Sequence, residues 1–108
     1  MKATNTQIQM RKGLLELCVL HIISRGEVYV SDVLDELKEA KLMVVEGTMY
    51  PLLNRLKNAS LISYHWVESE VGPPRKYYSI TQEGGKFLQE LKACWQSLEQ
   101  SVLTITSK

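Results

Sequence analysis

Residues 46–62 read EGTMYPLLNRLKNASLI, a helix-forming segment that passes without a long linker into a strand-forming one. Pro51 lacks an N–H group and is tolerated only near a helix start, so the helix is predicted to begin at about residues 46–48 and to end near Asn58. Its apolar residues recur at the spacing i, i+3, i+4, i+7, which is typical of a helix that buries one face. They are Met49, Leu52, Leu53 and Leu56.

The opposite face of this helix is polar, and the only acid in the segment is Glu46 at its start. Such side chains can reach phosphate oxygens and the edges of bases in the major groove of DNA. An ordinary solvated helix face has the same composition, so this face alone leaves both interpretations open. Its members are Gly47, Tyr50, Pro51, Asn54, Arg55 and Asn58, flanked by Thr48 and Lys57.

The segment that follows predicts a β-hairpin over residues 61–80. Residues 61–68 (LISYHWVE) alternate and are rich in β-branched and aromatic side chains, residues 71–74 (VGPP) form a turn, and residues 75–80 (RKYYSI) form a second strand. Arg75 and Lys76 follow the rigid turn at once, which suits contact with a phosphate backbone or a minor groove. A charged turn kept for solubility is the alternative, and two acids before the turn, Glu68 and Glu70, favour it.

Two further helices are predicted before residue 46. Residues 10–24 (MRKGLLELCVLHIIS) are apolar almost all round, so this helix must be covered on more than one side, by its own core and by a partner subunit. Ser31 is the predicted N-cap of a second helix that ends at about Ala40. Three helices followed by a hairpin define a mainly α fold with a small β-hairpin wing, the winged helix-turn-helix.

The last predicted helix begins after Thr81, runs to about Thr106, and carries the clearest periodic signal. Six residues follow a 3-4-3-4-3 spacing, the apolar seam of a coiled coil. Little domain is left for the seam to pack on, so we expect it to meet a second copy of itself; packing onto the first helix is the alternative, and both can hold in part. Residues 1–80 are therefore predicted to be the DNA-binding domain and residues 81–108 the dimerisation helix. The seam consists of Leu88, Leu91, Trp95, Leu98, Val102 and Ile105.

The composition limits the classes of function. A chain of 108 residues with a net charge of +1 is one domain with an appended element, and its total charge does not indicate nucleic-acid binding. No apolar run approaches the ~20 residues of a membrane span, and no export leader opens the chain, so we expect a cytoplasmic protein. The sequence has no nucleophile with a base at a readable spacing, no glycine-rich phosphate loop and no His/Cys/Asp metal cluster. We therefore expect no enzyme, no catalytic or metal site and no cofactor.

Three segments together resemble the PadR family of bacterial transcription regulators, in its short subfamily with a single C-terminal dimerisation helix. They are residues 12–20 (KGLLELCVL), 46–62 and 72–81 (GPPRKYYSIT). The resemblance implies a homodimer whose third helix enters the major groove while the wing contacts the flanking backbone. Where the family often has a glycine after that helix, this chain has Ala59-Ser60, so Asn58 or Ser60 must take the turn. The implied DNA-binding residues are Thr48, Tyr50, Asn54, Arg55, Lys57, Arg75 and Lys76.

The resemblance also implies a ligand. Some short members bind flat, lipophilic compounds between paired tryptophans at the dimer centre, and Trp95 stands at the matching position of the seam. A tryptophan on a seam can equally fill space. We thus expect a repressor that acts as a homodimer on a two-fold operator and is released by a small aromatic ligand. A winged-helix module that binds protein and not DNA is the alternative.

Overall fold

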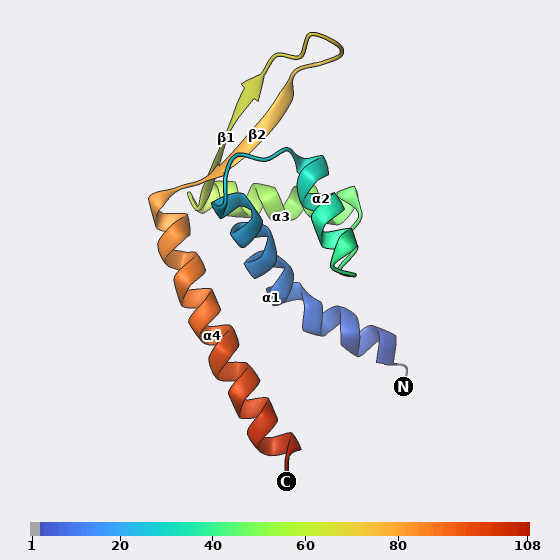
Figure 1. Cartoon of the computed structure of the whole chain (residues 1–108), viewed down its shortest axis with the longest axis vertical. Helices are drawn as coiled ribbons and strands as arrows, with labels where there is room; N and C mark the ends of the chain where they lie inside the picture. The colour runs from blue at the N-terminus through green and yellow to red at the C-terminus, as the bar shows by residue number, and fades with distance from the viewer. Residues whose placement is uncertain (1–2) are drawn as a thin grey trace.

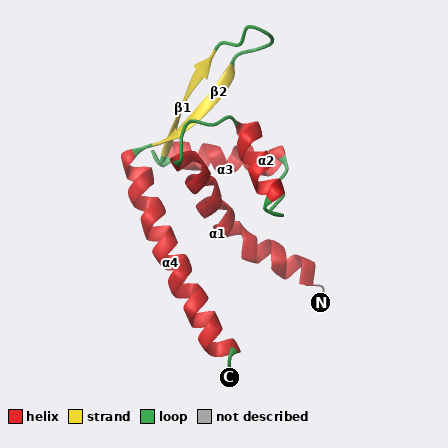
Figure 2. Cartoon of the chain, viewed as in Figure 1, coloured by secondary structure: helices red, strands yellow, loops and turns green. Residues whose placement is uncertain are grey.

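The computed structural model describes residues 3–108, in which helices and one antiparallel hairpin follow the predicted order (Figure 2). The fold is mainly helical with a β-hairpin wing, as expected. None of the helices within residues 3–108 is long and apolar enough to cross a membrane. The elements are α1 (Ala3–Ser24), α2 (Val30–Glu39), α3 (Glu46–Asn58), β1 (Ile62–Val67), β2 (Arg75–Ile80) and α4 (Gln82–Thr106).

Helix α3 has the predicted bounds, and Ser60 makes the turn that follows it. Ser60 adopts a φ of 63°, in the left-handed region, and the Leu61 N–H then donates to the Leu56 carbonyl at 2.9 Å. A helix end of this kind usually uses glycine, because a Cβ is unfavourable at positive φ. The chain therefore accepts local backbone strain where α3 passes into the wing.

The starts of α1 and α2 differ from the predictions. Helix α1 begins at Ala3 and not near residue 10, because the polar residues before residue 10 extend the helix beyond the body of the protein. The N-cap of α2 is Tyr29 and not Ser31. The Asp32 carboxylate accepts a hydrogen bond from the Tyr29 N–H at 3.1 Å, which satisfies the helix start without a serine cap.

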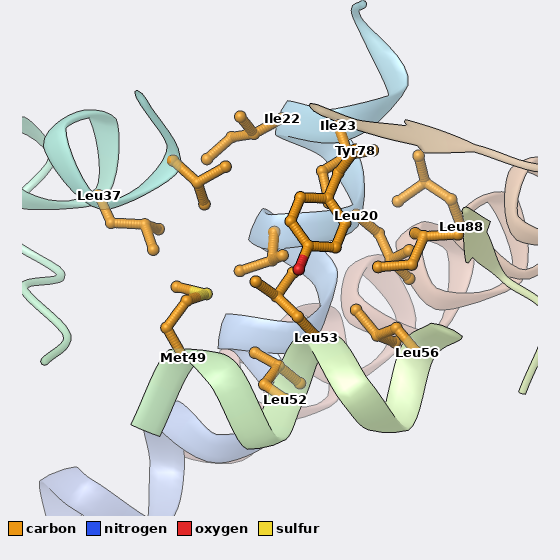
Figure 3. Packing of buried hydrophobic residues seen from close by; sticks show 13 residues of the cluster. Leu20, Ile22, Ile23, Leu37, Met49, Leu52, Leu53, Leu56, Tyr78 and Leu88 are labelled. Carbon is orange, nitrogen blue, oxygen red and sulfur yellow. The ribbon is translucent and has the colours of Figure 1, made fainter. Parts of the chain in front are cut away.

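One hydrophobic core joins all the helices to the root of the wing (Figure 3). The buried stripe of α3 lies against the C-terminal half of α1, and Leu37 of α2 and Tyr78 of β2 close two further sides. Burial raises the pKa of Tyr78, so its hydroxyl stays neutral. Because the stripe is buried, the opposite face of α3 must point away from the core. The buried stripe is Met49, Leu52, Leu53 and Leu56, as predicted.

The wing consists of β1, residues 68–74 and β2, and its root is anchored to the link between α1 and α2. Its strands pair from Ile62↔Ile80 to Val67↔Arg75. Val28 and Tyr78 exchange backbone hydrogen bonds of 2.9 and 3.2 Å. The root is thus held on both sides, while the tip extends past the helices (Figure 1).

Thr81 joins α4 to the turn after α3. Its Oγ1 accepts from the Gly84 N–H at 2.9 Å as the N-cap and donates to the Ser60 carbonyl at 2.6 Å. The Thr81 N–H donates to the Leu61 carbonyl at 3.1 Å. Gly84 is buried against the same Leu61 carbonyl. Helix α4 therefore starts from a fixed point directly beside the end of α3.

Only the first part of α4 packs against the body, and the rest extends as an arm (Figure 1). The molecule consequently measures 59 × 32 × 22 Å. Leu88 is 2% exposed and lies in the core of its own protomer, which corrects its assignment to the dimer interface, because it offers no surface to a second copy. Leu91 is half-buried against that core, and the later seam residues are exposed.

Candidate nucleic-acid interface

The outward face of α3 presents the polar residues that the sequence singled out. The five α3 residues predicted to bind DNA are all exposed: three lie opposite the core stripe, and Thr48 and Lys57 lie at its flanks. Arg55 and Lys57 belong to the last turn of α3, where the helix dipole favours positive charge. These residues are Thr48, Tyr50, Asn54, Arg55 and Lys57.

The wing holds Lys76 between aromatic rings on the side that faces α3. Its ammonium lies 4.2 Å from the ring centre of Tyr64 and 5.1 Å from that of Trp66. Lys57 of α3 approaches the Tyr64 ring from the helix, at 5.3 Å. Tyr64 thus sits between one cation of α3 and one of the wing, and cation–π attraction holds both in place.

A second aromatic group lies on the other face of the wing. The rings of Tyr29 and Tyr77 are 3.8 Å apart, and the Arg75 guanidinium lies 5.2 Å from the Tyr29 ring. Hydrogen bonding with Tyr29 and desolvation raise the pKa of Tyr77, so its hydroxyl stays neutral. His65 stacks on Tyr77 and lies 3.8 Å from a Glu27 carboxylate oxygen. Arg75 is exposed, and its guanidinium remains available to a partner.

A cleft of about 480 Å³ separates the wing from the first turns of α2 and α3. Two cations, three aromatic rings and one carboxylate line it, so its charge favours an anion with flat, apolar parts. The cleft brings Tyr50 together with Arg75 and Lys76, three residues predicted at DNA. It is lined by Tyr29, Val30, Ser31, Glu46, Tyr50, Trp66, Pro74, Arg75 and Lys76.

Sequence reasoning missed Tyr29, Tyr64 and Trp66 in this site. The alternation over residues 61–68 identified a strand, but it did not show which face of the strand meets α3. Glu68 and Glu70, which weaken the positive field, are exposed and lie beyond the paired strands, outside the residues that line the cleft.

A second cleft, of about 340 Å³, lies beside Trp95. Its lining comes from α1, α2, the residues just after α2, and α4, and it is mainly apolar, with titratable groups at Cys18, His21, Glu36 and Lys92. Burial, then Lys92 and Arg25, lower the pKa of His21, which keeps the imidazole neutral near pH 7. A flat apolar compound fits the character of this cleft, and so does an apolar side chain of a second copy.

Comparison with known proteins gives one consistent family. A model of the PadR-like family of transcriptional regulators matches residues 19–90. A PadR-like transcription factor from Bacteroides fragilis is 54% identical, with a TM-score of 0.80 over 94% of this chain and 98% of that one. A PadR-like regulator from Bacillus cereus is 40% identical, with a TM-score of 0.81 over 93% of this chain and 98% of that one. A padr family regulator from Eggerthella lenta is 29% identical, with a TM-score of 0.88 over 96% of this chain and 91% of that one.

Proposed function

The chain belongs to the PadR-like family of transcriptional regulators, and from this premise we propose that it represses transcription in the cytoplasm by binding a two-fold operator as a homodimer. Members of this family bind DNA and are not enzymes. The observation that carries the proposal is that Tyr50 of α3 shares one cleft with the wing cations Arg75 and Lys76, while Lys57 of α3 reaches the Tyr64 ring of the wing. Residues 1–80 bind DNA, and residues 81–108 assemble the dimer.

In this proposal α3 enters the major groove and the wing contacts the adjacent backbone. Arg55 is a candidate for base reading, because a guanidinium can donate two hydrogen bonds to one guanine. Lys76 is a candidate for a phosphate contact, because an ammonium ion carries no base-specific pattern. The face of α3 and the wing project from one core, so one rigid body presents both contacts.

Two substitutions separate these roles. Arg55→Ala should weaken operator binding by ~1–3 kcal/mol and relax sequence preference, whereas Lys76→Ala should weaken binding to all duplexes alike and lower the salt slope by about one unit. Lys108→Ala removes the same charge at the far end of the chain and serves as the control. The wild-type protein should be retained on immobilised duplex DNA until the salt concentration is raised. Elution at the lowest salt concentration, as expected for a module that binds only protein, would contradict DNA binding.

The exposed part of the α4 seam supports the homodimer. Leu98, Val102 and Ile105 are 56%, 57% and 71% exposed, and such a continuous apolar stripe is unfavourable in water. A second copy of the same stripe is the matching surface in a symmetric dimer. Ile8 and Met10, exposed on the projecting half of α1, offer further apolar area.

Assembly is tested by mass in solution. Light scattering should give about 25 kDa, twice the 12.3 kDa of the chain. Leu98→Lys should shift the protein to the monomer mass, because it places a charge on the seam. Gln100→Lys, on the opposite face of α4, should leave the dimer intact. A monomeric wild-type protein contradicts the assembly.

Trp95 and the cleft beside it support release by a ligand. Trp95 is 40% exposed, so its ring is available to a flat lipophilic compound or to its copy in the dimer. A compound that fits only one separation of the two α4 helices shifts DNA affinity by its differential binding to the two states. Planar dyes should quench Trp95 but not Trp66, as read in the Trp66→Phe and Trp95→Ala variants. Dye binding that survives Trp95→Ala contradicts the site.

A further inference from the structure

Trp66 lies beside Lys76 in the interface described above, but no contact with DNA has been assigned to it so far. It is 60% exposed although it is the largest apolar side chain of the wing, and it takes no part in the core. It pairs across the hairpin with Lys76 and lines the cleft that faces Tyr50 of α3. Tryptophan is enriched at binding surfaces because it contributes a large, rigid apolar area.

The chemistry of the cleft limits the class of partner that can bind there. Trp66 provides a flat apolar wall, and the Lys76 ammonium lies 5.1 Å from the ring centre, so an apolar contact and a cationic contact adjoin. A sugar–phosphate backbone has the matching order, because each apolar sugar face adjoins an anionic phosphodiester. Glu46 stands at the α3 side of the cleft and repels a phosphate there, which directs the anion toward Lys76 and Arg75.

We propose that this cleft receives one strand of DNA beside the groove that α3 enters, with the Trp66 indole packed on a deoxyribose and the Lys76 ammonium on the adjoining phosphate. The inference rests on the proposed function and adds a contact that carries no base specificity. The Tyr64 ring, 4.2 Å from the same ammonium, holds Lys76 in place independently of Trp66. The contribution of Trp66 is therefore separable from that of Lys76.

Fluorescence tests the contact directly. The chain has two tryptophans, so Trp95→Phe leaves Trp66 as the single emitter. A short duplex of mixed sequence is added at low salt, binding is followed by the anisotropy of labelled DNA, and acrylamide quenching of Trp66 is read in the same samples. We expect the quenching constant to fall by about two-fold or more on binding, because the indole becomes covered. Bound DNA with unchanged quenching overturns the inference and leaves the proposed function standing, whereas no binding to any duplex overturns both.

Affinity gives a second readout. Trp66→Ala should weaken the mixed-sequence duplex and the operator by the same factor, roughly 3- to 10-fold, and Trp66→Phe by less. The salt slope should stay at the wild-type value, because Lys76 still meets its phosphate. Val71→Ala, at a residue 87% exposed at the tip of the wing, is the matched control and should bind as wild type. Unchanged affinity in Trp66→Ala, or a loss accompanied by a reduced salt slope, overturns the direct contact.

Discussion

Replacing Gly84 by alanine tests how closely the start of α4 lies against the turn after α3. A Cβ built on Gly84 overlaps the Leu61 carbonyl oxygen and lies 2.7 Å from Ile80 Cγ1 and 2.9 Å from the Leu61 carbonyl carbon. Most of these atoms are backbone, so a side-chain rotation cannot relieve the overlap. The helix must move away from Leu61, and the hydrogen bonds of Thr81 to this turn stretch with it.

The change in the free energy of unfolding of Gly84→Ala follows from three contributions. Overpacking costs about 1–3 kcal/mol. Weakening the two Thr81 hydrogen bonds costs about 1–2 kcal/mol. The higher helix propensity of alanine returns about 1 kcal/mol, so Gly84→Ala should lower the free energy of unfolding by about 1–4 kcal/mol. A Cβ on the neighbouring Gly85 meets nothing within 4 Å, so Gly85→Ala should raise stability by about 0.5–1 kcal/mol.

Urea unfolding, followed by far-ultraviolet circular dichroism, measures both variants. Protein concentration is held equal, because association shifts apparent stability. The two melting temperatures should also differ by at least about 6 °C, since the two variants differ by at least about 1.5 kcal/mol and 1 kcal/mol corresponds to roughly 4–8 °C in a domain of this size. If Gly84→Ala unfolds at the same urea concentration as Gly85→Ala, the close approach of α4 to Leu61 is wrong.

Substitutions at three other positions test local features by the same unfolding assay. Ser60→Gly should raise stability by about 0.5–1 kcal/mol by relieving the φ of 63°, and a decrease would refute backbone strain there. Thr81→Ala should lower the free energy of unfolding by about 1–2 kcal/mol, whereas Thr81→Ser should retain most of that stability. Equal losses in both variants would show that the Thr81 hydroxyl does not stabilise the junction. Burial, Lys92 and Arg25 depress the pKa of His21 in the folded protein. The contribution of the neutral His21 imidazole to the free energy of unfolding is therefore fully present above about pH 6.5 and is lost as the pH falls through the folded pKa. His21→Gln should therefore flatten the stability loss below about pH 6.5, and an unaltered pH profile would show that another group titrates.

Local signals account for the elements that form the site. The bounds of α3 could be predicted because Pro51 limits the start and the apolar stripe sets the length. The start of α4 could be predicted because Thr81 has the side chain of an N-cap and does accept the Gly84 N–H. The outward face of α3 follows directly, since a helix that buries one stripe exposes the other.

Contacts between distant segments could not be predicted in the same way. Periodicity marks Leu88 as a seam residue, but it cannot tell whether its neighbours belong to the same chain, and here they do. The polar start of α1 lacks an apolar stripe, so no pattern indicates that the helix begins at Ala3. The approach of Lys76 to Trp66 depends on strand register, and that of Tyr29 to Tyr77 on the path of the link between α1 and α2.

The fixed junction at Thr81 makes α4 a lever arm. With 25 residues, α4 is about 37 Å long at ~1.5 Å per residue. The N-cap of α4, Thr81, is hydrogen-bonded to Ser60 and Leu61, directly after α3, so α4 and the DNA-binding domain turn together. A rotation of that domain by about 5° therefore corresponds to a displacement of about 3 Å at the far end of α4. In the proposed homodimer, a modest repacking between the two α4 helices would therefore change the angle at which the two DNA-binding domains meet their half-sites.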